Sequence, residues 1–171
     1  MPLRSKPAGD PFPASRPRFP KQYGIPGNLK GMLPWSFVDE RMAKARNYWL
    51  STTRPDGTPH TRPVDGVWLE STLCFGGSPE TRWVRNLQKN SAVSVHLGGE
   101  VEVLILEGIA QFITEPKHPL AEPLLEASRK KYPEYYSGKS PFRPFWMLRP
   151  RVVFAWTLAQ FPKSATRWVL S

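Results

Sequence analysis

The sequence predicts a mainly β protein: a small antiparallel barrel of six or seven strands with two or three peripheral helices. Short segments alternate apolar and polar residues, and turn residues separate them at hairpin spacing. A closed barrel leaves no exposed sheet edge, so it suits such consecutive strands. At 171 residues, the chain is long enough for one hydrophobic core.

Two regions differ in composition. Residues 1–34 hold eight prolines, which lack an amide donor, so we expect a basic arm that is extended or partly disordered. Residues 35–171 should form the barrel domain. Ser36 and Asp39 have a capping pattern that predicts a helix ending near Arg46.

The barrel elements follow in order. A Pro-Asp-Gly turn at 55–57 joins strand 48–54 to strand 60–69, and Leu73 begins a short strand. Ser78 as N-cap, with Pro79 at the first helical position, predicts a second helix. The remaining expected elements are strand 92–97, strand 101–114 with a bend at Gly108, helix 120–132, strand 152–158 and strand 166–170.

Composition limits the classes of function. The formal net charge is +10, and the basic excess lies at 1–31 and 129–171, where phosphates would be attracted. Cys74 is the only cysteine, so no internal disulfide can form. No apolar run approaches the roughly 20 residues that span a bilayer. We therefore expect a cytoplasmic protein without membrane contact.

The strongest local signal is Gly-Gly-Ser at 76–78 followed by Thr81 and Arg82. Glycines allow close approach of a ligand to the backbone, and a helix start presents free amides that bind phosphate. An ordinary capped helix with solvated arginines explains the same residues equally well.

A second signal is the strand that contains Arg62, Pro63 and Gly66. Arg62, Val64 and Gly66 share one face by strand alternation, so Arg62 could reach a phosphate at the helix start. A third signal is Trp156 and Trp168 near several arginines, although tryptophans on strands more often fill a core or a subunit interface.

Side-chain catalysis has little support. The sequence has no nucleophile elbow, no Walker loop and no paired-cysteine motif. His60, His96 and His118 lie on different elements, so no metal site is expected, and Cys74 resembles a buried hydrophobe. A cofactor that performs the chemistry is therefore favoured.

The ordered motifs resemble the pyridoxamine 5′-phosphate oxidase-like superfamily. They are Tyr-Trp-Leu-Ser-Thr at 48–52, Pro-Asp-Gly-Thr-Pro-His at 55–60, Arg-Pro-Val at 62–64, Leu-Cys-Phe at 73–75, Thr-Arg at 81–82, Arg-Asn-Leu at 85–87, Asn90, Glu-Gly at 107–108 and Thr-Arg-Trp at 166–168. The last is similar to the flavin/deazaflavin oxidoreductase branch. The resemblance covers 36–115 well and 145–171 loosely.

The resemblance implies a split β-barrel homodimer with two sites at the subunit interface for FMN or, alternatively, the deazaflavin coenzyme F-420. The cofactor-binding residues it implies are Arg62, Pro63, Val64, Gly66, Val67, Gly77, Ser78, Thr81, Arg82, Trp83, Trp156, Arg167 and Trp168. Arg62, Ser78, Thr81 and Arg82 would hold the phosphate.

Two positions depart from the family pattern. Trp83 stands where a phosphate-binding lysine is common, and Val103 stands where classical members have glutamine. Both departures argue against oxidation of pyridoxamine phosphate itself.

The sequence thus favours a flavin- or deazaflavin-dependent oxidoreductase acting on a small organic substrate. The alternative is a non-enzymatic binding or sensing module for a flavin, haem or another planar ligand. We do not expect a nucleic-acid partner, because the basic residues flank the motif region rather than line it.

Overall fold

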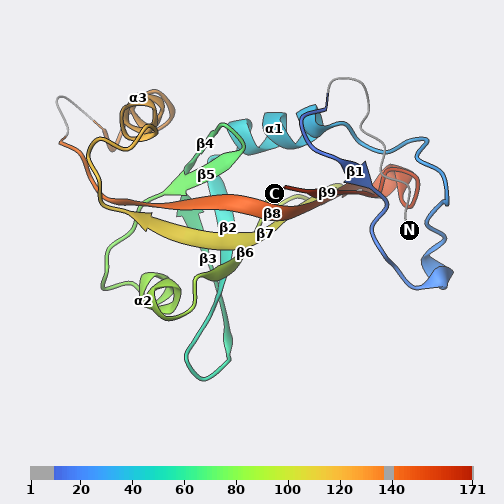
Figure 1. Ribbon diagram of the computed structural model, residues 1–171, viewed down its shortest axis with the longest axis horizontal. Coiled ribbons are helices and arrows are strands. Elements are labelled where there is room, and N and C mark those ends of the chain that lie inside the picture. The colour runs from blue at the N-terminus through green and yellow to red at the C-terminus, as the bar shows by residue number, and fades with distance from the viewer. Residues whose placement is uncertain (1–9, 137–140, 171) are drawn as a thin grey trace.

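The computed structural model describes residues 10–136 and 141–170. Within these ranges the chain is mainly β with three α-helices, which confirms the predicted fold class (Figure 1). The strands are β1 (Ala14–Ser15), β2 (Asn47–Thr53), β3 (Pro59–Asp65), β4 (Val67–Leu69), β5 (Thr72–Phe75), β6 (Ala92–His96), β7 (Glu102–Ile113), β8 (Phe145–Thr157) and β9 (Thr166–Val169). The helices are α1 (Trp35–Lys44), α2 (Arg82–Lys89) and α3 (Ala121–Lys131), with 3₁₀ turns at η1 (Lys21–Tyr23) and η2 (Leu158–Gln160).

The nine strands of the described residues form one antiparallel sheet, two strands more than the largest expected number. One extra strand is β1, from the proline-rich arm, and the other arises because Gly66 divides the expected strand 60–69 into β3 and β4. The pairing runs β3-β2-β6-β7-β8, and β8 then pairs with both β5 and β9. Hydrogen bonds do not close the barrel: its edges β3 and β4 meet only through Gly66, so the barrel is split rather than closed.

Strand β8 changes partners near its middle. Its first half pairs with β5, from Phe75 opposite Trp146 to Leu73 opposite Leu148, and its second half pairs with β9. Pro150 lies between the halves and lacks an amide donor, which suits a break in pairing. The sequence pattern predicted only the second half of β8, because Pro150 interrupts the strand signal. Gly108 faces Pro150 beside the register shift in β7, and a Cβ there would lie 2.7 Å from the carbonyl oxygen of Arg149.

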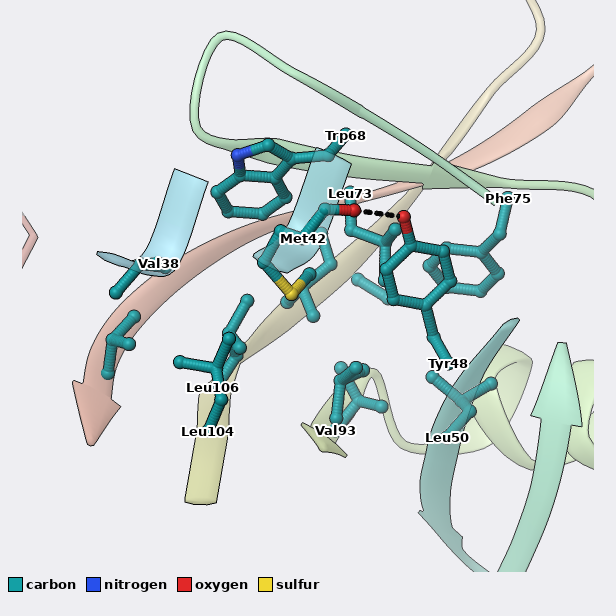
Figure 2. Packing of buried hydrophobic residues seen from close by; sticks show 14 of the residues in the cluster. Val38, Met42, Tyr48, Leu50, Trp68, Leu73, Phe75, Val93, Leu104 and Leu106 are labelled. Carbon is teal, nitrogen blue, oxygen red and sulfur yellow. Dashed lines mark hydrogen bonds between the residues drawn. The ribbon is translucent and has the colours of Figure 1, made fainter. Parts of the chain in front are cut away.

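The main core lies between the sheet and α1 (Figure 2). Met42, Tyr48, Leu50 and Leu106 have no solvent exposure. The hydroxyl of Tyr48 donates a hydrogen bond of 2.6 Å to the carbonyl oxygen of Met42, the dashed line in Figure 2. This bond satisfies the one polar atom of a buried side chain and ties the end of α1 to β2.

The described part of the arm packs on the barrel. Phe12 contacts Trp35 edge to face at 4.6 Å, and Ala14 pairs with Trp168. Helix α1 begins at Trp35, one residue before the predicted cap Ser36, because the carboxylate of Asp10 accepts the Trp35 amide at 3.0 Å. A carboxylate at a helix start satisfies a free amide and favours the helix dipole. Residues 1–9 of the predicted arm lie outside the described residues.

Candidate functional site

Helix α2 begins later than the sequence predicted. Its first residue is Arg82, and Thr81 has the extended backbone of an N-cap. Ser78 instead closes a turn: its hydroxyl accepts the Glu80 amide at 3.2 Å, and its carbonyl accepts both the amide and the hydroxyl of Thr81. Because these local bonds compete with a helix, the predicted start at Ser78 and Pro79 was wrong by three residues. Ser78, Thr81 and Arg82 nevertheless stay together at the start of α2.

The two glycines before this turn differ in their surroundings. No atom lies within 4 Å of an ideal Cβ at Gly76, so this side of the backbone is open. At Gly77 a Cβ would lie 2.1 Å from the indole of Trp83, which packs over it. Trp83 is buried and tilts against Phe75 at 5.7 Å. Gly77 therefore makes room for a tryptophan, whereas Gly76 leaves room for a ligand.

Three arginines gather around His60 on β3. Burial lowers the pKa of His60, and the charges of Arg62, Arg54 and Arg82 lower it further. Arg62 comes from β3, Arg82 from the first turn of α2, and Arg54 from the end of β2. The two predicted arginines, Arg62 and Arg82, thus both lie within electrostatic reach of His60. Sequence reasoning missed Arg54. Its position at the β2–β3 turn, close to His60 on the following strand, could have indicated it.

Buried hydrogen bonds connect the elements that carry these arginines. The amide of Asn86 on α2 donates to the hydroxyl of Thr52 at 3.0 Å, and that hydroxyl donates to the carbonyl of His60 at 3.3 Å. His60 Nδ1 and Asn86 Oδ1 are buried without a partner among the described residues. Buried polar contacts of this kind hold a helix and a strand in one relative position. They hold α2 on the β2–β3 hairpin.

Gly66 lies at the break between β3 and β4, and both its backbone amide and its carbonyl make hydrogen bonds to side chains. Its amide donates to the hydroxyl of Tyr132 at 3.1 Å, and its carbonyl accepts the Lys131 amine at 2.9 Å. Lys131 also donates to the hydroxyl of Tyr48 at 2.9 Å. Burial lowers the pKa of Lys131 to about 8. Sequence reasoning missed this connection, because it joins residues more than sixty positions apart.

A cavity of about 740 Å³ opens beside these elements. One wall is backbone of Gly66, Val67, Gly77 and Ser78, and the facing wall is α3 with the segment after it. Burial raises the pKa of Cys74, which also lines the cavity, to about 12, so this thiol stays protonated. Pockets of this size commonly hold a cofactor or a drug-sized ligand.

The remaining predicted residues divide into two groups. Pro63 is exposed on β3, while Val64 is buried in the core next to it. Trp156, Arg167 and Trp168 lie on β8 and β9, at the end of the sheet away from α2 and α3 (Figure 1). Trp156 packs against Phe161 at 6.0 Å, and Arg167 is half-buried. The side chain of Trp168 is fully buried and packs against Trp35, with ring centroids 5.6 Å apart.

Residues 10–136 and 141–170 contain no group of three or more histidine, cysteine or acidic side chains placed to bind a metal ion. Within the same ranges, no helix is both long and apolar enough to cross a bilayer.

Comparison with solved structures shows the same fold at low identity. A conserved hypothetical protein from Mycobacterium tuberculosis is 15% identical with a TM-score of 0.62, over 77% of this chain and 89% of that one. An F-420 reductase is 20% identical with a TM-score of 0.53, over 67% and 94%. HutZ, the heme storage protein from Vibrio cholerae, is 18% identical with a TM-score of 0.56, over 67% and 88%.

Sequence comparison is more specific. No curated protein matches the chain. A family model described as pyridoxamine 5′-phosphate oxidase matches residues 37–157, which include β2 to β8, α2, α3 and all of α1 except its first two residues. Because this match covers well over half of the sequence, the chain belongs to the pyridoxamine 5′-phosphate oxidase family.

Proposed function

We propose that this protein is an oxidoreductase that binds FMN or the deazaflavin F-420 and transfers hydride to or from a small organic substrate. The observation that carries this proposal is that the charges of Arg62, Arg54 and Arg82 all act on His60, and that Arg82 begins α2 shortly after the open backbone of Gly76. The cavity of about 740 Å³ begins at the same backbone.

The donors at this place suit a phosphate monoester. Arg62 makes one side-chain hydrogen bond, to the neighbouring carbonyl of Thr61 at 2.8 Å. The described residues include no acidic partner within salt-bridge distance of Arg54, Arg62 or Arg82. The start of α2 adds free backbone amides. Positive groups without acidic partners, placed at a helix start, are suited to a dianionic ligand.

The backbone from Pro63 to Val67 would then lie along the ring system. Lys131 and Tyr132 hold Gly66 on both polar atoms, so this backbone is fixed in position before any ligand arrives. The bound flavin would supply hydride transfer, and the protein would position it and shield it from water. Trp83 stands where a lysine is common, so the three arginines would carry the charge.

The proposal includes a homodimer, supported by one row of side chains across the outer face of the sheet. Residues that are directly opposed on neighbouring strands lie on the same face of the sheet. By this pairing, one row across β3, β2, β6, β7, β8 and β9 consists of Pro63, Trp49, His96, Ile105, Phe154 and Arg167. Trp49 is 37% exposed. A two-fold axis through the middle of this row would exchange its ends. The partner's Arg167 would thereby lie next to Pro63, so the cofactor site would contain residues of both chains.

The first test is titration of the purified chain with FMN and with F-420, followed by visible absorption and fluorescence. We expect saturable binding of one of the two, and reduction or reoxidation of the bound cofactor with an added electron partner. A chain that binds neither cofactor would overturn the proposal. Binding without turnover by any donor or acceptor would favour the non-enzymatic module.

The dimer is tested by light scattering and by cofactor titration of Ile105→Arg. Ile105 is half-buried near the middle of the row, so an arginine there should give a monomer with weaker cofactor binding. Leu158→Arg is the matched control, because Leu158 is 54% exposed and lies outside the row. A wild-type monomer, or a dimeric Ile105→Arg variant, would contradict the interface.

The second candidate, a storage or sensing module, has one observation in its favour, the fold it shares with HutZ. For haem specifically, the cavity argues against it. Its described lining contains no histidine, which is the usual ligand of haem iron, and its one cysteine is held protonated.

A further inference from the structure

We propose that the cavity between β4, β5 and α3 binds an uncharged, planar aromatic substrate and rejects phosphorylated ones. This inference rests on the proposed function only for the place of the cofactor ring. The chemistry of the substrate follows from the cavity walls. It differs from what the family name suggests, since pyridoxamine 5′-phosphate carries a phosphate group.

Aromatic side chains from three parts of the chain line the cavity. Tyr132 and Tyr135 stack with ring centroids 6.4 Å apart at the end of α3. Phe142 and Phe145 meet edge to face at 6.4 Å on the segment that leads into β8, and Phe75 contributes from β5. Flat rings of this kind favour stacked or edge-on contact with another flat ring. A planar ligand could therefore contact aromatic groups from three elements.

Helix α3 presents no cation to the cavity. Its lining residues are Ala121, Glu122, Leu124, Leu125 and Ser128. The basic residues of its last turn are Arg129, Lys130 and Lys131, and none of them lines the cavity. Lys131 is instead bound to Gly66 and Tyr48.

The charged groups of the lining also disfavour an anion. Among the described residues they are the carboxylates of Asp65 and Glu122 and one guanidinium, that of the exposed Arg143. A phosphate bound against α3 would lose water and find no buried positive partner there. An uncharged ring would lose little and would cover apolar surface.

The cavity lies beside the proposed position of the cofactor ring, so a ligand bound in it would be placed to react as a substrate. Gly66 and Val67 line the cavity together with Gly76 and Gly77. The backbone of Gly66 and Val67 is part of the segment proposed to lie along the cofactor ring. Tyr132 lines the cavity and also binds Gly66, so the aromatic wall and this backbone are held at a fixed separation. A flat molecule in the cavity would lie against the same backbone.

The experiment compares two ligands that differ only in the phosphate: 2-naphthol and 2-naphthyl phosphate. Calorimetric titrations of the wild-type chain are run in excess inorganic phosphate, which competes at the start of α2. We expect 2-naphthol to bind saturably, and about tenfold or more tightly than its phosphate ester. No saturable binding of 2-naphthol, or equal or tighter binding of the ester, would overturn the proposal.

Two variants of α3 locate the binding. Leu125→Arg places a cation in the lining and should weaken 2-naphthol binding about tenfold, while binding of the ester improves. Glu126→Arg is the matched control, since Glu126 is exposed and does not line the cavity. Equal affinities for 2-naphthol in the two variants would place the ligand elsewhere and contradict the proposal.

Cofactor titration of the same samples separates the two proposals. If the chain binds 2-naphthol but neither FMN nor F-420, the proposed function fails and the aromatic site stands. If it binds a cofactor but prefers 2-naphthyl phosphate, the proposed function stands and the aromatic site fails.

Discussion

The arginines at the two ends of the sheet are used differently. At the β1–β9 end, Arg16 donates to the carbonyls of Asn28, Lys30, Lys163 and Ala165, at 2.5–2.9 Å. At the α2 end, Arg62 donates to the carbonyl of its own neighbour, Thr61. Both lie in a strongly basic chain. The first has its donors satisfied within the fold, while the second keeps donors for a ligand.

The comparison shows that net charge is a weak guide to a binding site. Arg16 lies within the basic stretch that the sequence marks as attractive to phosphates, yet its guanidinium ties the arm to the loop before β9. The +10 charge is therefore partly structural. What marks a site is a cluster of positive groups that the fold leaves without partners.

The sharpest test of this difference is the double variant Arg62→Ala and Arg82→Ala. Each charge-assisted contact is worth on the order of 1.5–3 kcal/mol, so we expect a loss of about 3–6 kcal/mol in cofactor binding free energy. Titration with FMN and F-420 measures it, and urea unfolding should be unchanged. Arg151→Ala, at an exposed position on β8, is the control. Unaltered affinity of the double variant would disprove the phosphate site.

For Arg16→Met we expect a loss of stability without a loss of cofactor affinity. The variant leaves four carbonyls without their donor, so the free energy of unfolding should fall by about 2–3 kcal/mol. Urea unfolding measures this loss, and cofactor affinity under native conditions should stay the same. Arg18→Met serves as the control, because Arg18 is exposed. If Arg16→Met reduced cofactor affinity and left stability intact, the two ends of the sheet would not differ as described.

A smaller effect is expected at the start of α1. Asp10→Ala removes the acceptor of the Trp35 amide and should lower the free energy of unfolding by about 1 kcal/mol. Asp10→Asn keeps an acceptor and should retain most of the stability. Thermal unfolding of the three proteins distinguishes these outcomes. An equal loss in both variants would show that the cap is not the cause.

A pH-dependent effect is expected at Lys131, whose pKa is lowered to about 8. At this amine the folded protein binds fewer protons than the unfolded chain between pH 8 and 10, which makes the free energy of unfolding rise with pH. The buried thiol of Cys74, whose pKa is raised to about 12, contributes with the opposite sign, so the contribution of Lys131 is the difference between two variants. One proton limits its slope to about 1.4 kcal/mol per pH unit. In urea unfolding, the free energy should rise with pH more steeply in the wild type and in Lys130→Met than in Lys131→Met. Equal slopes in the wild type and in Lys131→Met would contradict the burial of this amine.

Elements with a strong local pattern could be predicted from the sequence. The helix at 120–132, the bend at Gly108 and the hairpin before Arg62 all lie where alternation and turn residues placed them. Strand β8 was shortened in the prediction because Pro150 normally ends a strand. Here the missing amide falls where the strand changes partners, which no local pattern reveals.

The site was predictable only where its residues are neighbours in the chain. Ser78, Thr81 and Arg82 form one short segment. Strand alternation and the family motif both assigned Arg62 to the same site. Tyr132 joins the site by a hydrogen bond to Gly66 across a long sequence separation, which composition and periodicity do not encode. Arg54 is close to His60 in the β2–β3 hairpin, and its effect on His60 appears only in the structure. Gly77 shows the reverse: its purpose is to admit Trp83, and that contact appears only in three dimensions.

Strand β8 has a consequence for how the chain can be handled. Because it is the shared neighbour of β5, β7 and β9, residues 145–157 complete both ends of the sheet at once. Removing them would strip partners from strands that begin as early as Thr72, so shortened fragments of this chain should not fold independently. Such distant pairings form slowly, and we expect ordering of the whole sheet to require residues 145–157.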